Sequence, residues 1–222
     1  MFYACGGLFV ALTAAVALGW TRGLDLAVTG ATYAAAPCRV LDEGSRLDLL
    51  FSWEVSLGAV LALTVVSKAT RGYAALVPLL SGLVMFTLAE VLLKTLVAVP
   101  SPGDVFGLRL ECGLGTYRLL QLPVTLAPYT YPSGYAGRLA YIGTLLLGLI
   151  GARRVGPGRG WTWLVALAVM ALAASRVVVG WHWTTDVLGG LLLGTAVARL
   201  ALGADGWFGW PWRDRAGPAE RT

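Results

Sequence analysis

Six long apolar runs divide this sequence and limit what it can fold into. A helix needs about 20 apolar residues to cross a bilayer, and each run approaches that length. Only 13% of the residues are charged, about half the share that a soluble domain carries. The sequence therefore predicts an all-α fold, a polytopic membrane protein built as a bundle of six transmembrane helices. The runs are residues 2–20, 50–66, 74–97, 135–151, 161–179 and 185–202.

The segments between and after these runs predict one membrane domain, residues 1–205, followed by an interfacial or disordered tail, residues 206–222. Segment 21–48 carries charges of both signs and could hold a short interfacial helix. Segment 98–130 is rich in Pro and Gly, which predicts an ordered loop. No basic residue precedes the first run, so we expect a retained first helix and not a signal peptide.

The basic residues predict the orientation of the helices. Lys and Arg concentrate in the loops after the second and fourth runs and in the tail, and such segments stay in the cytoplasm. Both termini are then cytoplasmic, in the inner (plasma) membrane, and segments 21–49, 98–134 and 180–184 face outside. These loops account for the net charge of +5, so membrane lipids are expected as partners and nucleic acid is not.

Cysteine and histidine are scarce. Cys38 and Cys112 fall on the predicted outer side, where they could form a disulfide or remain two unpaired thiols. No cysteine spacing matches a zinc motif, and His182 is the single histidine. We therefore predict no metal site and no cofactor.

Three short stretches on the predicted outer side carry groups that suit a phosphate. Lys94 ends the third run, and Arg176 ends the fifth, so both can donate to phosphate oxygens. The Ser133-Gly134 turn precedes the fourth run, where backbone N–H groups at a helix N-terminus can bind an anion. Glycine there lets the backbone approach closely.

A nucleophile and its orienting group follow in the third stretch. A neutral imidazole can attack phosphorus, and His182 is the single candidate. Asp186, four residues later, could hold that imidazole in one tautomer. Each residue alone has an ordinary explanation, such as a helix cap for Asp186 or an interfacial anchor for Tyr135. Their order and shared side favour a phosphate site.

In this order the stretches resemble the type 2 phosphatidic acid phosphatase family, which shares its fold with vanadium haloperoxidases. The signature of that family has three blocks, K-x6-R-P, P-S-G-H and S-R-x5-H-x3-D. The third block is complete here, from Ser175 and Arg176 to His182 and Asp186. The resemblance covers about residues 50–200 and implies that His182 is the nucleophile and Asp186 its orienting group. The residues implied to hold the phosphate are Lys94, Ser133, Gly134 and Arg176.

The first and second blocks depart from the signature. The first keeps Lys94 but has Ser101 at its arginine position, which removes one phosphate clamp while leaving Ser101 as a phosphate-binding candidate. The second has Tyr135 where the family has the histidine that protonates the leaving oxygen. Arg138, one turn later, is the favoured replacement for the missing positive charge. Arg109 and Arg118 are further candidates on the same side.

These departures leave three explanations. The leaving group could need little acid help, as when a lipid pyrophosphate loses one phosphate from another. Tyr135 could donate the proton, although the ordinary pKa of tyrosine, about 10, makes it a reluctant donor. The site could instead bind a phospholipid headgroup without turnover.

The favoured prediction is a metal-independent lipid phosphatase or phosphotransferase. It removes phosphate from a lipid (pyro)phosphate, such as a polyprenyl pyrophosphate, through a phosphohistidine at the outer membrane face. A transporter would carry more charge deep inside its helices than Glu54 and Glu90 provide. Glu90 is expected to pair with Lys94 or Arg176.

Overall fold

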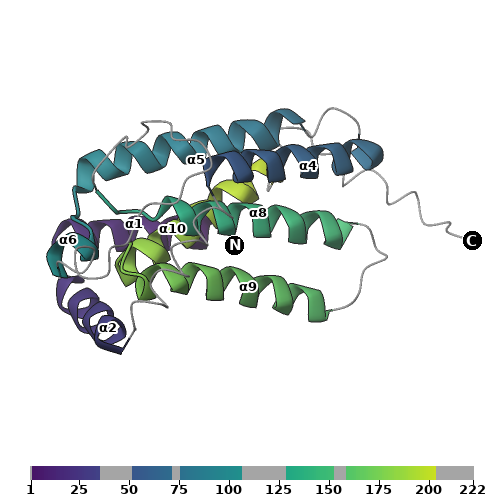
Figure 1. Ribbon diagram of the computed structural model, residues 1–222. Helices are drawn as coiled ribbons and strands as arrows, with labels where there is room; N and C mark the ends of the chain where they lie inside the picture. The colour runs from purple at the N-terminus through teal and green to yellow at the C-terminus, as the bar shows by residue number, and fades with distance from the viewer. Residues whose placement is uncertain (1, 36–51, 72–75, 107–128, 153–158, 204–222) are drawn as a thin grey trace, which may run out of the picture.

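The computed structural model describes residues 2–35, 52–71, 76–106, 129–152 and 159–203, and every regular element within these ranges is an α-helix (Figure 1). Each of the six apolar runs contains one helix. Within the described ranges, two further helices lie between them, α2 (Arg22–Ala35) and the short α6 (Pro102–Phe106). The six are α1 (Phe2–Ala17), α4 (Trp53–Arg71), α5 (Leu76–Val97), α8 (Gly134–Ala152), α9 (Arg159–Val178) and α10 (Thr184–Ala201).

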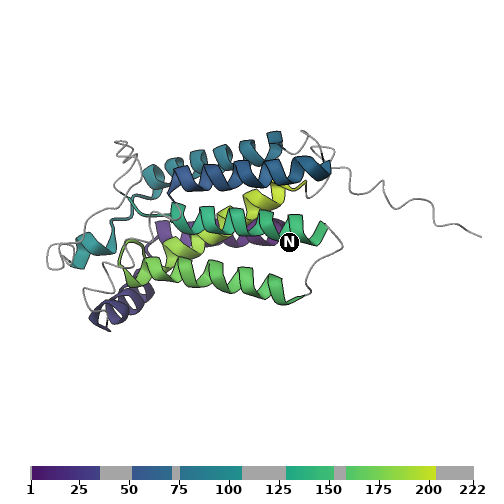
Figure 2. The same cartoon turned by 45° about the vertical axis from the view of Figure 1, so that its right-hand side comes forward.

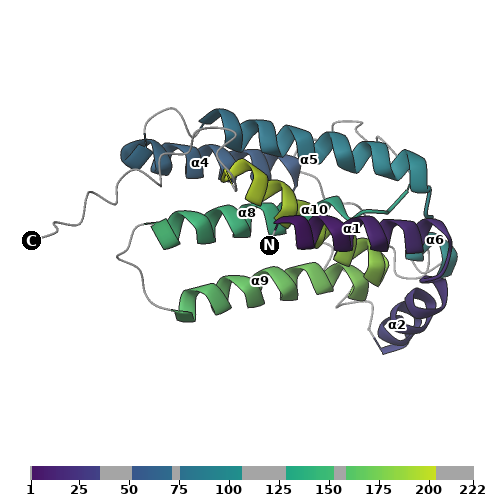
Figure 3. The ribbon, with the colours of Figure 1, turned by 180° about the vertical axis from the view of Figure 1, so that it is seen from behind.

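Helix α10 occupies the centre of the bundle. It packs against α8, α1, α5, α9 and α2, and the views from the front and from behind show it passing obliquely between its neighbours (Figures 1 and 3). Helices α4 and α5 lie side by side along one flank, and α8 and α9 along another (Figure 2). Helix α2 turns away from α1 by 89°, and α2 and α6 lie at the same end of the bundle.

Two described helices are long and apolar enough to cross a membrane, over Val77–Val97 of α5 and Gly160–Val178 of α9. A third span is possible if the bent pair of α1 and α2 crosses as one unit. Only 22% and 17% of the residues in the first two spans are buried in the protein, so most of their apolar side chains need lipid around them. The all-α architecture is confirmed, and the count of six spans stays a prediction.

The segments between the apolar runs agree with the sequence in one case and differ in the other. Segment 21–48, which could hold a short helix, contains α2, which is 14 residues long. Segment 98–130, predicted to be loop, contains α6. Cys38, Cys112, Arg109, Arg118 and the tail from residue 206 onwards lie outside the described residues, so the predictions made for them stay predictions.

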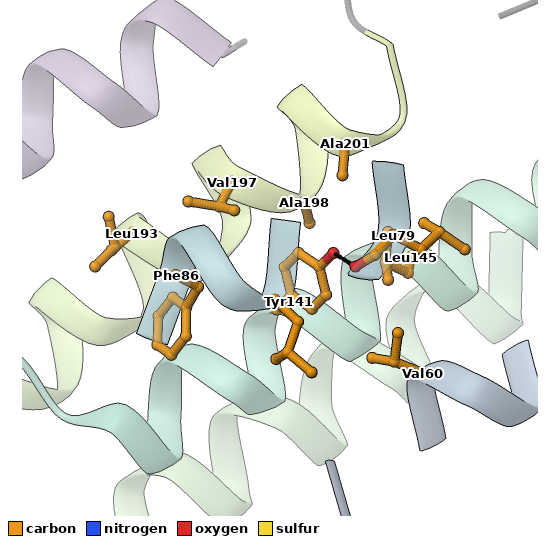
Figure 4. Packing of buried hydrophobic residues seen from close by; sticks show 10 residues of the cluster. Val60, Leu79, Phe86, Tyr141, Leu145, Leu193, Val197, Ala198 and Ala201 are labelled. Carbon is orange, nitrogen blue, oxygen red and sulfur yellow. Dashed lines mark hydrogen bonds between the residues drawn. The ribbon is translucent and has the colours of Figure 1, made fainter. Parts of the chain in front are cut away.

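Apolar side chains from α4, α5, α8 and α10 form the largest buried cluster (Figure 4). Tyr141 of α8 lies fully buried within it, and its hydroxyl group donates a 2.6 Å hydrogen bond to the carbonyl of Leu79 in α5. This bond gives the buried hydroxyl group the acceptor that it needs. The buried members are Val60, Leu79, Leu83, Phe86, Tyr141, Leu145, Leu193, Val197, Ala198 and Ala201.

Glycines let α8 and α10 approach each other at backbone distance. A Cβ atom added at Gly190 would overlap the carbonyl of Ser133, and one added at Gly194 would overlap the carbonyl of Gly137. Small residues four apart on a helix allow this kind of close packing between membrane helices. The contact places the start of α8 against the middle of α10.

Replacing Gly194 by Ala is expected to destabilise the protein by about 2 kcal/mol, because the new methyl group meets backbone atoms that cannot rotate away. Gly58→Ala in α4 is the matched control, since an added Cβ atom there meets nothing within 4 Å. Thermal unfolding in detergent, followed by circular dichroism, measures both. Equal midpoints for the two variants would contradict the close helix contact.

Candidate active site

The turn after α9 carries His182 and is closed by its own backbone. Gly180 has a φ of 72° and donates to the carbonyl of Val177, while Trp181 donates to the carbonyl of Arg176. These two bonds around a left-handed glycine form a Schellman motif, which ends a helix sharply. The N–H of His182 also donates to the Arg176 carbonyl, at 3.3 Å. The motif therefore presents His182 just beyond the end of α9.

Asp186 lies one turn further along, in the first turn of α10. Its side chain is fully buried, and Oδ2 accepts a 2.9 Å hydrogen bond from the N–H of Trp183. The same oxygen lies 3.5 Å from Nδ1 of His182. That separation is slightly longer than a well-formed hydrogen bond, and catalytic hydrogen bonds commonly tighten when substrate binds. Asp186 is therefore placed to orient the imidazole.

The surroundings of His182 favour its neutral form. Burial lowers the pKa of His182 below its ordinary value of 6.5. Asp186 opposes this shift, and the positive charges of Lys94 and Arg176 add to it. The imidazole is therefore neutral near pH 7, which is the form that has a lone pair for nucleophilic attack.

Ser133 joins the second motif to the third. Its hydroxyl oxygen accepts a hydrogen bond from the N–H of Ala136 and so caps the N-terminus of α8. Its own N–H donates a 2.9 Å hydrogen bond to the carbonyl of Asp186. Ser133 and Gly134 thus stand at the end of α8 that faces the His–Asp pair.

The segment after α5 ties the first motif to the other two. The carbonyl of Val99 accepts from the N–H of Thr130, just before the second motif, and the carbonyl of Pro100 accepts from the indole of Trp183 at 2.7 Å. Ser101, at the arginine position of the family signature, is 3% exposed, and its carbonyl accepts from Val105 in α6. The role of Ser101 in phosphate binding stays a prediction.

Tyr135 and Arg176 lie against each other. The guanidinium carbon of Arg176 lies 4.3 Å from the centre of the Tyr135 ring, which is a cation–π contact. Arg176 is 1% exposed, and two of its nitrogen atoms donate to the hydroxyl group of Ser175, each at 3.3 Å. The residue at the position of the family's second-motif histidine therefore packs against Arg176, which is predicted to bind phosphate.

Glu90 pairs with two cations at once. Its Oε1 lies 2.8 Å from Nζ of Lys94, and its Oε2 lies 3.1 Å from Nη1 of Arg138. The predicted pairing with Lys94 is confirmed. The second cation is Arg138 of α8, which the sequence analysis assigned to phosphate binding, and not the alternative partner Arg176. The four-residue spacing of Glu90 and Lys94 predicts their pairing on one helix face. No such spacing predicts the pairing of Glu90 with Arg138, which lies on another helix.

Asp25 is a site-supporting residue that the sequence analysis missed. It lies in α2, is 6% exposed, and accepts from the N–H of Thr185 at 3.0 Å and from its hydroxyl group at 2.6 Å. Thr185 directly precedes Asp186, so this contact fastens the start of α10. No local signal marks Asp25, because its partner is 160 residues away in the chain.

The three motifs therefore meet at one end of the bundle, close to α2 and α6. Within the described ranges, no group of three or more His, Cys, Asp or Glu side chains is placed to hold a metal ion. The chemistry offered by the described side chains is that of an oriented imidazole beside Lys and Arg, next to a helix N-terminus.

Such a combination is the one expected of a helical membrane protein that acts on phosphate groups. The sequence profile of the PAP2 superfamily matches residues 75–210, more than half of the chain. The chain belongs to the PAP2 superfamily, which confirms the resemblance carried by the three motifs.

Individual relatives agree with this assignment. The crystal structure of a transmembrane PAP2-type phosphatidylglycerolphosphate phosphatase from Bacillus subtilis is similar with a TM-score of 0.67, over 92% of this chain and 95% of that one, at 19% identity. At that identity the likeness shows the fold. An undecaprenyl-diphosphatase from Sulfolobus acidocaldarius is 35% identical over 75 residues, which are 33% of this chain. The match spans about a third of that relative's length, 32%.

Asp25→Ala is expected to lower stability by about 1–3 kcal/mol, because it leaves a buried N–H and a buried hydroxyl group of Thr185 without their acceptor. Thr185→Val and the double variant complete a double-mutant cycle, read by thermal unfolding. We expect the two losses to be strongly non-additive. Simple additivity would mean that the two residues act independently.

Proposed function

We propose that this protein is a lipid phosphatase or phosphotransferase that removes a phosphate group from a lipid (pyro)phosphate through a phosphohistidine intermediate. The observation that carries the proposal is the position of His182, 3.5 Å from a buried Asp186, in a turn tied to the cation-bearing motifs. By the orientation of its basic loops, the site faces the outside or periplasm of the inner membrane.

The chemistry follows from the two nitrogen atoms of the imidazole. Nδ1 of His182 faces Asp186 and carries the proton in the neutral ring, which leaves the lone pair on Nε2. Nε2 attacks phosphorus, a P–N bond forms, and the bond from phosphorus to the leaving oxygen breaks. Water or another acceptor then takes the phosphoryl group from His182. This route uses no metal ion.

The phosphate group is held by cations and by a helix N-terminus. Lys94 and Arg176 donate to its oxygen atoms, and the Ser133-Gly134 turn supplies backbone N–H groups at the start of α8. Ser101 and Arg138 are assigned secondary roles in phosphate binding. The stacking of Tyr135 on Arg176 supports a role for the tyrosine in keeping the guanidinium in place.

The missing second-motif histidine favours a substrate with a good leaving group. A phosphate leaving from a pyrophosphate is a much weaker base than an alkoxide, so it needs little protonation. The partial similarity to an undecaprenyl-diphosphatase supports the same substrate class, a polyprenyl pyrophosphate. Tyr135 as the proton donor is the second possibility. A site that binds a phospholipid headgroup without turnover is the alternative function, favoured by the absence of any second histidine.

The central test is phosphate release by detergent-purified protein from a panel of lipid monophosphates and lipid pyrophosphates. We expect release from pyrophosphates, and a loss of at least about 10³-fold in His182→Ala, because no other side chain can form the covalent intermediate. Vanadate is expected to inhibit the wild-type protein. Undiminished release by His182→Ala would refute the mechanism.

Tyr135→His is the informative companion variant in the same assay. It restores the family's second motif, so we expect it to gain activity on monophosphates, whose alkoxide leaving group needs a proton. No release from any substrate by the wild-type protein, with lipid still bound, would favour the binding function.

The pH dependence follows from the lowered pKa of His182. Protonation removes the nucleophilic lone pair, so kcat/KM is expected to be full above pH 6.5 and to fall as the pH drops through the depressed pKa. Asp186 raises that pKa, so Asp186→Asn should move the acidic midpoint to still lower pH and reduce the maximal rate. If Asp186→Asn leaves the acidic midpoint unchanged, the loss of kcat/KM at low pH comes from protonation of the substrate and not of His182. The phosphate group of the substrate also titrates near pH 6.

A further inference from the structure

Glu90 is a buried carboxylate in the middle of the proposed phosphate site. Its side chain is 9% exposed and lies on α5 one turn before Lys94. The two carboxylate oxygens are divided between two cations, Nζ of Lys94 at 2.8 Å and Nη1 of Arg138 at 3.1 Å. The carboxylate also packs against Gly134, where even a methyl group on the α-carbon would overlap it.

These three neighbours are the groups that the proposed function assigns to the phosphate. Lys94 and Arg138 supply positive charge, and Gly134 is the first residue of α8, whose N-terminus attracts anions. An anionic side chain thus sits against the same cations and the same helix end that a phosphate group would use. It also lies beside the second motif, because Gly134 directly follows Ser133, whose N–H donates to the carbonyl of Asp186.

We propose that Glu90 is an internal counter-anion of the phosphate site, which pairs with Lys94 and Arg138 and competes with a bound phosphate group for them. The inference rests on the proposed function for the identity of the ligand, a phosphate group. Glu90 thereby sets the charge of the site and limits how tightly a phosphate group is held, whether that group belongs to a lipid or is the released product.

The physical basis is the cost of unbalanced charge away from water. Lys94 and Arg138 are 19% and 17% exposed, and cations in such places need a partner to offset their desolvation. An ammonium group has three donors, so Lys94 can bind Glu90 and a phosphate oxygen together. The second anion is repelled by the first, however, and this repulsion is large where water is scarce. Glu90 therefore weakens phosphate binding while stabilising the cations that perform it.

Weaker binding of the phosphate group serves turnover. Interactions that hold substrate, transition state and product equally tightly do not raise kcat, and a tightly held product slows the cycle. A fixed carboxylate that competes for Lys94 favours departure of inorganic phosphate after the phosphohistidine is hydrolysed. Glu90 is therefore a residue that tunes the affinity for the phosphate group. It acts through Lys94 and Arg138 and not on the reacting atoms.

The test compares Glu90→Gln with the wild-type protein, using inorganic phosphate and vanadate as probes. Binding is measured as the concentration dependence of the ligand-induced shift in thermal unfolding, which needs no turnover. We expect Glu90→Gln to bind both anions about tenfold more tightly, because one negative charge is removed from the site. In the substrate assay, KM and the inhibition constant of phosphate should fall, and kcat should not rise.

Glu54→Gln is the matched control. Glu54 is another carboxylate in an apolar helix, in the first turn of α4, and its removal is expected to leave anion affinity unchanged. Glu90→Asp is the second variant, used because Glu90→Gln removes a negative charge that Arg138 pairs with. It keeps the charge but shortens the reach to Lys94, so anion binding should lie between that of the wild type and that of Glu90→Gln.

Unchanged or weaker anion binding by folded Glu90→Gln would overturn the inference, as would an equal gain in Glu54→Gln. If Glu90→Gln does not fold, wild-type affinity in Glu90→Asp would overturn it. These outcomes are separate from the fate of the proposed function. If the wild-type protein releases no phosphate, the proposed enzymatic function is wrong. If Glu90→Gln nevertheless binds vanadate more tightly than the wild type, the role of Glu90 as a counter-anion still holds.

Discussion

The close backbone contact between α8 and α10 is the constraint on which the site depends. Because Gly190 and Gly194 have no side chains, the start of α8 lies directly against the middle of α10. Only at that separation can the N–H of Ser133 reach the carbonyl of Asp186. The second and third motifs, more than 40 residues apart in the chain, thereby become parts of one surface.

Other tertiary bonds hold the remaining parts in place around this contact. The carbonyl of Pro100 accepts from the indole of Trp183, so the segment after the first motif is tied to the turn that carries His182. Asp25 of α2 fixes Thr185 through two hydrogen bonds. A reactive imidazole needs such rigid support, because small errors in its position reduce the rate steeply.

The site balances its charges internally. Glu90 is buried beside Lys94 and Arg138, and Asp186 is buried beside His182. Burial makes every one of these interactions stronger than it would be in water, and it makes any unpaired charge costly. One of the two departures from the family signature lies against a further buried cation, since Tyr135 stacks on Arg176.

The sequence by itself determined the helices, the family and most of the candidate residues. Apolar runs specify membrane helices through their length, and the third motif keeps its spacing because His182 and Asp186 lie within one local turn. The tertiary structure alone decided that Arg138 pairs with Glu90, that Tyr135 stacks on Arg176 and that Asp25 supports α10. Those contacts join distant segments, and their geometry depends on how closely glycine-bearing helices pack. The spacing of Gly190 and Gly194 permits a close approach, but it does not say which helix lies against them.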